Sequence, residues 1–200
     1  MSLKKNLRGE MKKRLNKTAG EEFRFQGEQA TALLRSSPIW SGYSAFFLFL
    51  SMDTEIDSSL LFKAALESGK KVFAPKVETE RLVFYPVLSA GGPWNKGPFG
   101  IREPFVDKTQ GKDPAGAGDF PALIIAPGLA FDRNGNRLGR GRGFYDRFFA
   151  ELETESLRYF ALGLCMDFQL VDQVPVEEND KKMDCILTCK TLIYPGKEQF

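Results

Sequence analysis

The first 35 residues place apolar side chains at helical spacing among charged ones. The apolar positions that recur every four residues near the start are Leu3, Leu7, Met11 and Leu15. With lysine and arginine between them, they predict an amphipathic helix. A second helix is expected over residues 21–34. It should break at Ser36-Ser37-Pro38, because proline cannot continue a helix.

Short apolar runs follow, each bounded by polar or turn-forming residues, and they predict buried strands. These runs cover residues 44–50, 71–75, 82–87, 122–126, 159–165 and 184–188. Helices are expected at residues 58–67 and 145–155, and Asp57 or Ser58 would cap the first of them. The polar turn Glu78-Thr79-Glu80 is expected to join two of the strands as neighbours.

Strands that alternate with helices are typical of an α/β fold. We therefore expect one three-layer α/β/α domain over residues 1–200, built on a mostly parallel central sheet. Two segments interrupt the alternation. Residues 89–104 are rich in glycine and proline and are expected to be ordered only as loop. Residues 107–119 are polar and glycine-rich, and we expect a mobile surface loop there.

Charge is nearly balanced, with 28 basic and 26 acidic residues and a net charge of +2. Dedicated nucleic-acid binders usually show a strong basic excess, so we expect no nucleic-acid partner. No apolar run reaches the roughly 18 residues needed to cross a membrane. The N-terminus leads straight into a charged, periodic segment and lacks the apolar region of a signal peptide. We therefore expect a cytoplasmic protein without a membrane partner.

The chain contains no histidine and three cysteines. The absence of histidine excludes Ser-His and Cys-His nucleophilic machinery and any histidine-bound metal. Cys185 and Cys189 lack a second pair of ligands that would complete a zinc site. Together with Cys165, they are expected to be buried free thiols. Proton transfers must then use carboxylates, lysine, tyrosine or the substrate itself.

The segment Gly139-Arg140-Gly141-Arg142-Gly143 is the strongest chemical signal in the chain. Glycines at alternate positions allow positive φ angles and a close approach of backbone amides to an anion. The helix that follows would turn its positive end toward phosphate, and Arg137 would add a further forked donor. The glycine spacing differs from both the Walker loop and the dinucleotide fingerprint. We therefore interpret residues 136–147 as a phosphate-binding loop that runs into a helix and holds a nucleotide. The alternatives are a flexible basic turn and a nucleic-acid-contacting Arg-Gly patch.

Other charged residues are ambiguous when taken alone. Lys4, Lys5 and Arg8 lie on one side of the first helix, where a solvated face is the ordinary role. Glu55 follows a buried strand, and it could simply compensate a helix dipole. Asp180 and Asp184 could be caps or surface carboxylates. Asp146, one turn into the helix after the glycine segment, could hold a magnesium ion that bridges phosphate oxygens.

Several separated motifs, taken together and in order, resemble the 5-formyltetrahydrofolate cyclo-ligase family, also called methenyltetrahydrofolate synthetase. They are Lys4-x-x-x-Arg8, residues 47–56 (FLFLSMDTEI), residues 97–104 (GPFGIREP), residues 126–147 with the specific block NRLGRGxGxYD, and residues 174–180 (VPVEEND). The similarity spans nearly the whole chain.

The resemblance implies a role for each matching residue. ATP would contact Lys4, Lys5, Arg8, Arg137, Leu138, Gly139, Arg140, Gly141, Arg142, Gly143, Phe144 and Tyr145. The folate would contact Leu50, Glu55, Arg140, Gly141, Arg142, Gly143 and Phe144, with Glu55 recognising the pterin. Arg140 and Arg142 would be catalytic, and Asp146 and Asp180 would serve Mg²⁺. The expected partners are ATP and 5-formyltetrahydrofolate, and we expect a monomer.

The implied reaction is the ATP- and Mg²⁺-dependent conversion of 5-formyltetrahydrofolate to 5,10-methenyltetrahydrofolate, with release of ADP and phosphate. Phe144 stands where the family commonly has tyrosine, and it keeps an aromatic face but loses a hydroxyl. Asn179 stands where many bacterial relatives have histidine. The change at Phe144 allows a second hypothesis, a non-catalytic paralogue that binds folate and nucleotide. The third hypothesis is an RNA-binding module that uses the Arg-Gly loop, against which the near-neutral charge argues.

Overall fold

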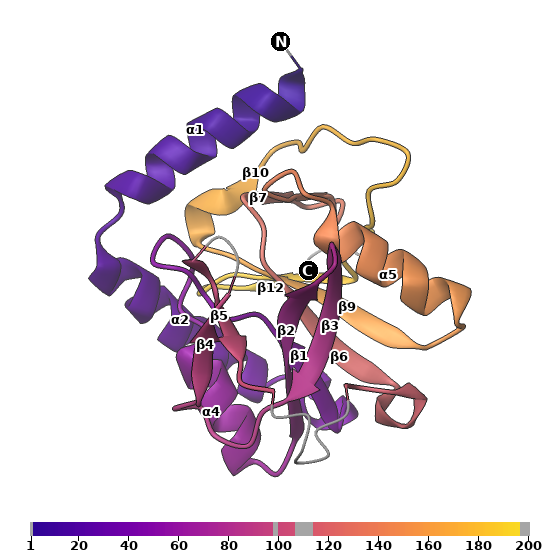
Figure 1. Cartoon of the computed structure of the whole chain (residues 1–200). Helices are drawn as coiled ribbons and strands as arrows, with labels where there is room; N and C mark the ends of the chain where they lie inside the picture. The colour runs from indigo at the N-terminus through magenta and orange to yellow at the C-terminus, as the bar shows by residue number, and fades with distance from the viewer. Residues whose placement is uncertain (1, 98–99, 107–113, 197–200) are drawn as a thin grey trace.

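A seven-stranded sheet forms the centre of the computed structural model, which describes residues 2–97, 100–106 and 114–196 (Figure 1). The helices are α1 (Leu3–Lys17), α2 (Gly20–Arg35), α3 (Pro38–Gly42), α4 (Ser59–Glu67) and α5 (Phe144–Thr154). The strands of the central sheet are β1 (Ala45–Leu48), β2 (Lys71–Glu78), β3 (Arg81–Pro86), β6 (Ala122–Ala126), β9 (Tyr159–Leu164), β11 (Cys185–Leu187) and β12 (Leu192–Ile193).

The strand order in this sheet is β12-β11-β9-β6-β1-β2-β3. The five inner strands run parallel to one another. The outermost strands, β3 and β12, are antiparallel to their neighbours. β2 and β3 form the expected hairpin, with Thr79 and Glu80 at positive φ in its turn. The prediction of a mostly parallel sheet is therefore confirmed.

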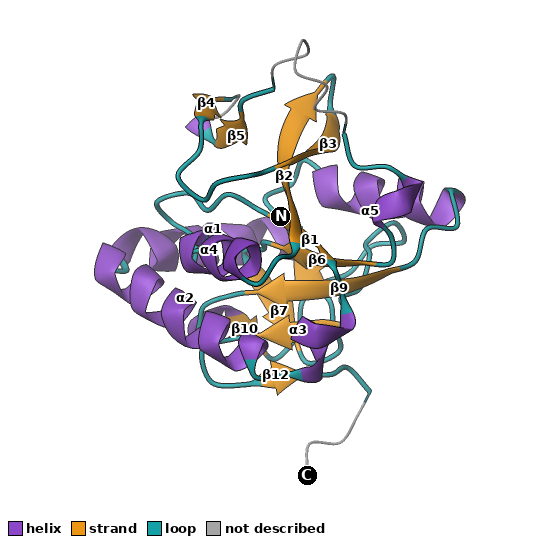
Figure 2. Ribbon diagram, turned by 90° about the horizontal axis from the view of Figure 1, so that it is seen from below, coloured by secondary structure: helices purple, strands orange, loops and turns teal. Residues whose placement is uncertain are grey.

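Side chains alternate along β1 between the two faces of the sheet. Phe46 and Leu48 belong to the core that also contains buried residues of α1, α2 and α4. Ala45 and Phe47 belong to the opposite core, which α5 closes with Phe149 and two neighbours. Figure 2 shows α1, α2 and α4 on one side of the sheet and α5 on the other. This arrangement confirms the three-layer α/β/α prediction.

The N-terminal helices follow the apolar spacing of the sequence. Met11 and Leu15 of α1 are buried, while its lysines and arginines, apart from Lys4, stay largely in contact with solvent. In α4, Asp57 accepts the backbone N–H of Ser59 at 2.8 Å, so Asp57 rather than Ser58 supplies the side-chain bond at the helix start. Ser58 instead donates its hydroxyl to the carbonyl of Phe49.

The expectation that residues 89–104 are only loop is wrong. They contain β4 (Trp94–Lys96) and β5 (Arg102–Pro104), which pair as a small antiparallel sheet. A third sheet, of order β10-β7-β8, is built from β10 (Leu170–Val171), β7 (Ala130–Asp132) and β8 (Arg137–Leu138). Strands of two or three residues are too short to show an alternating pattern, so the sequence did not reveal them.

Part of the expected mobile loop, residues 107–113, lies outside the described residues. The described remainder includes a short 3₁₀ turn at Ala117–Asp119, and the N–H of Ala115 bonds to the carbonyl of Phe84. Two of the three cysteines are buried as expected, but Cys189 is only half-buried. Every helix within the described ranges is too short or too polar to cross a lipid bilayer.

Candidate functional site

A cavity of about 890 Å³ opens beyond the carboxyl ends of β1 and β6. Phe49 and Leu50 follow β1 directly, and Pro127 and Gly128 follow β6. These two strands are neighbours, yet the sheet continues from β1 to β2 on one side and from β6 to β9 on the other. In open α/β sheets, ligands bind in the crevice at such a switch point. The topology therefore places the cavity where a ligand site is expected.

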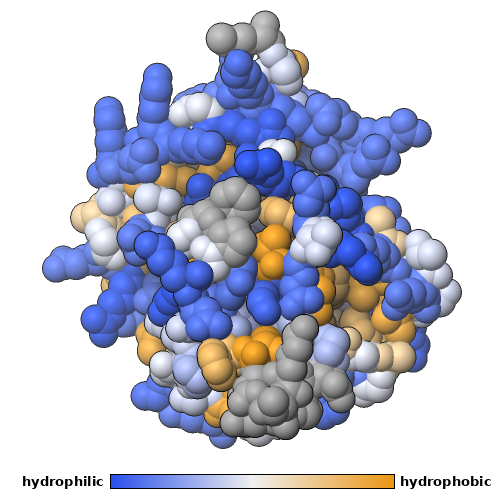
Figure 3. Space-filling model, in the orientation of Figure 1, coloured by the Kyte–Doolittle hydropathy of each residue, from blue (hydrophilic) through white to orange (hydrophobic). Residues whose placement is uncertain are grey.

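The cavity has a charged part and an apolar part, and Figure 3 shows apolar residues surrounded by hydrophilic ones at the centre of this face. The lining cations are Lys4, Arg8, Arg137, Arg140, Arg142, Arg147 and Lys181. The lining apolar and aromatic residues include Phe49, Leu50, Met52, Pro75, Val77, Leu82, Ile101, Phe144 and Tyr145. Such a surface suits a ligand that joins a phosphate group to flat rings.

The arginine–glycine segment connects β8 to α5 along one wall of the cavity. Gly141 and Gly143 have φ angles of 105° and 66°, a region that side-chain-bearing residues rarely adopt. Gly143 is the residue that precedes α5, and its carbonyl accepts the N–H of Arg147 at 3.0 Å. The early backbone N–H groups of a helix have no partner inside it. The glycines therefore aim the positive end of α5 at the cavity.

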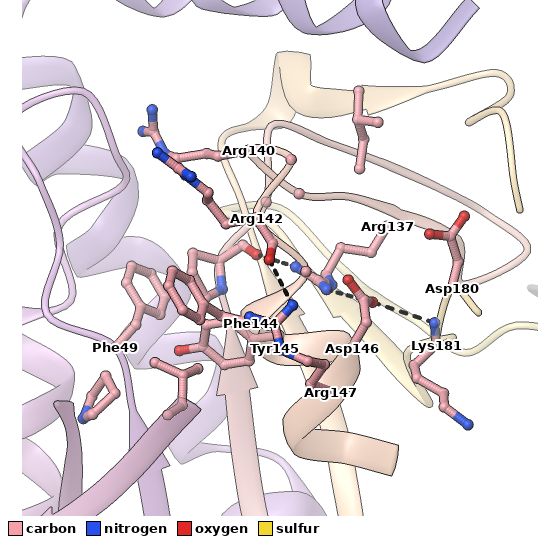
Figure 4. A pocket seen from close by; sticks show the side chains of 18 of the residues that line it. Phe49, Arg137, Arg140, Arg142, Phe144, Tyr145, Asp146, Arg147, Asp180 and Lys181 are labelled. Atoms are coloured by element: carbon pink, nitrogen blue, oxygen red, sulfur yellow. Dashed lines mark hydrogen bonds and ion pairs between the residues drawn. The ribbon is translucent and has the colours of Figure 1, made fainter. Parts of the chain in front are cut away.

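Three arginines of this region are held by hydrogen bonds, and Figure 4 draws those of Arg137 and Arg147. Arg137 is buried, and it donates to the carbonyl of Pro127 at 3.2 Å and to a carboxylate oxygen of Asp146 at 2.8 Å. Arg140 donates from Nε to Oε1 of Glu55 at 3.0 Å. Arg147 donates to the carbonyl of Arg142 at 2.9 Å, which ties the segment to α5. The positive groups are thus positioned before any anion enters.

Asp132 organises the turn that precedes the arginine–glycine segment. This carboxylate is fully buried. Its Oδ1 accepts the backbone N–H groups of Asn134 and Asn136 at 2.9 and 3.0 Å. Its Oδ2 accepts the side-chain amide of Asn136 and the N–H of Val174, both at 2.9 Å. One carboxylate therefore joins the β7–β8 turn to the chain that leads to Asp180.

Helix α1 covers one edge of the cavity with two cations. The Lys4 ammonium group is buried and contacts Asp180 at 2.5 Å and Glu177 at 3.1 Å. Arg8 donates from Nε to the carbonyl of Gly139 at 3.0 Å. These bonds join residues 176 and 131 positions apart in sequence. The N-terminal helix is consequently part of the cavity wall, where it contacts the arginine–glycine segment and the chain around Asp180.

Comparison with known proteins gives a single answer. The model of the "5-formyltetrahydrofolate cyclo-ligase family" matches residues 1–189. The chain belongs to this family. It is 30% identical over 203 residues to the 5-formyltetrahydrofolate cyclo-ligase of Mus musculus, covering 93% of each chain. It is 30% identical over 178 residues to that of Escherichia coli K12, covering 84% of this chain and 90% of the relative.

Among solved structures, the chain resembles the 5,10-methenyltetrahydrofolate synthetase of Aquifex aeolicus, determined by NMR. The TM-score is 0.81 at 28% identity, and the match covers 100% of this chain and 96% of the relative. The fold and the family membership thus agree. All residues that the family resemblance assigned to ligands line the cavity except Lys5, which lies in a shallow groove on the exposed side of α1.

In this member of the cyclo-ligase family, the two carboxylates assigned to magnesium are already paired with cations. Asp146 binds Arg137 and also accepts the N–H of Lys181 at 3.4 Å, and Asp180 binds Lys4. Among the described residues there is no group of three or more potential metal-ligating side chains. Mg²⁺ is commonly held by one or two carboxylates, with phosphate oxygens and water completing its shell. Two carboxylates on the wall of one cavity fit that chemistry.

Tyr145 brings an unpaired polar group to the cyclo-ligase cavity. Its hydroxyl is buried and, in the part of the chain that the structure describes, accepts or donates no hydrogen bond. Figure 4 shows it directed toward the side of Phe49. Burial raises the pKa of this phenol above its usual value of 10.0. The group therefore remains a protonated donor at neutral pH. Nε of Arg137 is a second buried donor without a described partner.

Sequence reasoning assigned no role to some residues of the cavity wall. Arg147 and Lys181 add cations, and Glu103 adds a buried carboxylate. The position of Glu103 inside one of the family motifs, residues 97–104, was the available signal. Arg147 ends the segment interpreted as phosphate-binding, but its side chain was assigned no contact, because charges on helix surfaces are ordinary.

Proposed function

We propose that this chain is a 5-formyltetrahydrofolate cyclo-ligase that uses ATP and Mg²⁺ to form 5,10-methenyltetrahydrofolate, releasing ADP and phosphate. The observation that supports this most is that one cavity combines cations from α1 and the arginine–glycine segment with apolar and aromatic side chains. A nucleotide triphosphate and a reduced pteridine require those two kinds of surface. Membership of the cyclo-ligase family names the folate, and the cations of the cavity support ATP as the second substrate.

The charged part of the cavity suits the triphosphate. Arg137, Arg140 and Arg8 are preorganised by hydrogen bonds to the protein, so they need little rearrangement when an anion enters. Gly141 and Gly143 let backbone amides approach phosphate oxygens closely. Asp146 and Asp180 would hold Mg²⁺ together with those oxygens, and the ion would neutralise charge on the phosphates.

The reaction needs no protein nucleophile. The formyl oxygen of the folate attacks the γ-phosphorus, and the bond to the departing ADP breaks. Nitrogen 10 of the same folate then attacks the formyl carbon and closes a five-membered ring. The proton of nitrogen 10 leaves to solvent, the carbon–oxygen bond breaks, and phosphate departs. A chain without histidine can support every step, because both nucleophiles come from the substrate.

The protein contributes position and charge. Arg140 and Arg142 lie on the segment that faces the cavity and would stabilise the charge that develops on the transferring phosphoryl group. Tyr145 offers a protonated hydroxyl to an oxygen of either ligand. Aromatic and aliphatic side chains such as Phe49 and Leu50 exclude water, which would otherwise hydrolyse the phosphorylated intermediate.

A one-pot assay tests the proposal. Purified protein with ATP, Mg²⁺ and 5-formyltetrahydrofolate should give the absorbance of the methenyl product together with equal amounts of ADP and phosphate. Omission of any one component should abolish the signal. Folded protein that binds both ligands by calorimetry without turnover would instead identify a non-catalytic paralogue. Phe144 is the residue that could account for that result, and Phe144→Tyr would then be the variant to assay.

We further propose that the protein works as a cytoplasmic monomer. Helix α1 and residues 177–181, far apart in the sequence, meet in the wall of this cavity, which supports a site formed within one molecule. Sedimentation equilibrium in the presence and absence of both ligands should give the mass of a single chain. A dimer that forms only with ligand would contradict this part of the proposal.

A further inference from the structure

Glu103 is a buried carboxylate in the cavity wall that the mechanism above does not use. It lies in β5 and is 5% exposed. Burying a charged carboxylate is costly unless hydrogen bonds or a cation compensate it. Among the described residues, no lysine or arginine pairs with it, and its one described hydrogen bond is from the N–H of Val77 to Oε1 at 3.0 Å. The environment therefore favours a ligand that brings further donors.

The other acids of the cavity wall have ionic partners or are exposed. Glu55 binds Arg140 through Oε1 and the N–H of Met52 through Oε2. Asp146 binds Arg137, and Asp180 binds Lys4. Glu103 is thus the buried acid of this wall whose charge no described cation neutralises. A neutral ligand with N–H groups fits there better than an anion.

The backbone around Glu103 is built to hold this side chain. The β1–β2 pairing ends at Phe73, so the outer part of β2 pairs with no strand on that side, and the carboxylate of Glu103 accepts the N–H of Val77. Gly97 packs directly against the Glu103 side chain, and a β-carbon at that position would overlap with it. Such a fit leaves the carboxylate little freedom to turn away from the cavity.

The surroundings of Glu103 suit a flat ring. Pro75 and Val77 of β2, Leu82 of β3, and Ile101 line the same cavity and are apolar. The ligand edge that fits best is therefore that of a planar heterocycle with two adjacent N–H donors. A 2-amino-4-oxopyrimidine ring has this edge, because its 2-amino group and N3–H lie side by side. Adenine has a donor beside a bare ring nitrogen, which a carboxylate would repel.

We propose that Glu103 recognises the 2-amino and N3–H groups of the pterin and so decides which ring enters the apolar part of the cavity. This inference rests on the proposed function, since it assumes a folate substrate. It gives Glu55 a different task, because Glu55 holds Arg140 in place. The pterin would then lie in the cavity against β2 and β5, with its formyl group nearer the arginines.

The test compares Glu103→Gln with wild type, using 5-formyltetrahydrofolate and an analogue that has a methyl group in place of the 2-amino group. Glutamine keeps the size and one acceptor oxygen, so the bond from Val77 can persist. We expect the KM for 5-formyltetrahydrofolate to rise roughly 10- to 100-fold, as for loss of a charged hydrogen bond, with the KM for ATP unchanged. The analogue should bind wild type weakly, and Glu103→Gln should discriminate far less between the two folates.

Glu78→Gln is the matched control, because Glu78 follows Val77 on β2 and does not line the cavity. It should behave as wild type. Glu55→Gln should still bind the analogue more weakly than 5-formyltetrahydrofolate, by the same factor as wild type. If Glu103→Gln does not melt cooperatively, Glu103→Asp, which retains the charge on a shorter stem, takes its place and should also bind the folate more weakly.

The outcomes separate two failures. Wild type that neither binds nor converts 5-formyltetrahydrofolate would overturn the proposed function itself. The assignment of Glu103 alone would be overturned if wild type is active but the folded Glu103 variant keeps the wild-type KM for 5-formyltetrahydrofolate and still binds the analogue as weakly as wild type does. If instead Glu55→Gln no longer discriminates between 5-formyltetrahydrofolate and the analogue, recognition of the 2-amino group belongs to Glu55.

Discussion

Arg140 illustrates how one side chain can be held ready by an acid that lies 85 positions away in sequence. The bond to Glu55 positions the guanidinium before ligands bind, and side chains preorganised in this way contribute most to charge stabilisation in a transition state. The effect of removing Arg140 should therefore appear mainly in turnover, with a smaller effect on binding.

We predict that Arg140→Ala lowers kcat by about 100-fold or more, with a smaller change in the KM for ATP. The reason is that its charge is needed most as the phosphoryl group transfers. Steady-state kinetics of product absorbance provide the measurement. Arg24→Ala is the control, because Arg24 lies on the exposed surface of α2, where it pairs with Glu28. A KM effect without a kcat effect would contradict the catalytic role.

Tyr145 gives a prediction about pH. Burial raises the pKa of its phenol in the folded protein above the usual value of 10.0. Above the usual pKa, which applies in the unfolded chain, the unfolded chain loses the phenol proton while the folded chain retains it. Folding therefore becomes less favourable as the pH rises. Tyr145→Phe removes this penalty. Urea denaturation should show that the free energy of unfolding of the variant rises relative to that of wild type between pH 9 and pH 11.

Near neutral pH the same variant should be as stable as wild type, since the hydroxyl has no described partner to lose. Equal alkaline sensitivity of the two proteins would show that Tyr145 reaches solvent in the folded state.

The sequence predicted which residues line the cavity better than it predicted which residues contact one another. The arginine–glycine segment, Lys4, Glu55 and Asp180 were all singled out, and they line one cavity. Their ionic partners were not foreseen, because contacts between Lys4 and Asp180 arise from tertiary packing and leave no mark in local spacing. Glu103 was part of a quoted motif, but only the fold shows that it is buried.

At the scale of elements, the β7–β8 turn depends on one buried carboxylate. Asp132 accepts three backbone N–H groups and one side-chain amide. Its loss would leave buried donors without partners, each at a cost of about 1–3 kcal/mol. The arginine–glycine segment starts directly after this turn, so its position depends on the same bonds.

We predict that Asp132→Ala lowers the free energy of unfolding by about 3 kcal/mol or more, as measured by urea denaturation. Asp132→Asn should cost less, because its amide keeps one oxygen acceptor. Both variants should also weaken ATP binding, since Arg137 follows the turn. Exposed Asp53, which lines no part of the cavity, provides the control in Asp53→Ala. A fully stable Asp132→Ala variant would mean that water replaces the lost acceptor.

Longer elements were predictable because their patterns are long. The helix with Met11 and Leu15 on one face and the strand around Phe47 were both found from apolar spacing. The order of the strands was not, because nothing local states that β6 lies beside β1. Residues 89–104 were misjudged, since glycine and proline mark turns but do not show that the segments between them pair.

At the scale of the whole molecule, ligand binding should couple to stability. A ligand that binds only the folded state at 100 times its Kd adds about 2.7 kcal/mol, or roughly 5–10 °C in Tm for a domain of this size. We predict a rise of that order with ATP and Mg²⁺ by thermal denaturation. Removal of the metal with EDTA should take away much of this gain, because Asp146 and Asp180 would then face the phosphates without a bridging cation. The same gain with and without metal would argue against their role.

The contact between Lys4 and Asp180 has a consequence for the newly made chain. The wall of the cavity combines Lys4 with a residue 176 positions further along the chain, so a growing chain on the ribosome lacks part of the proposed nucleotide site until Asp180 has been synthesised. Retention on an ATP resin should therefore separate molecules that contain this segment from fragments that end before it.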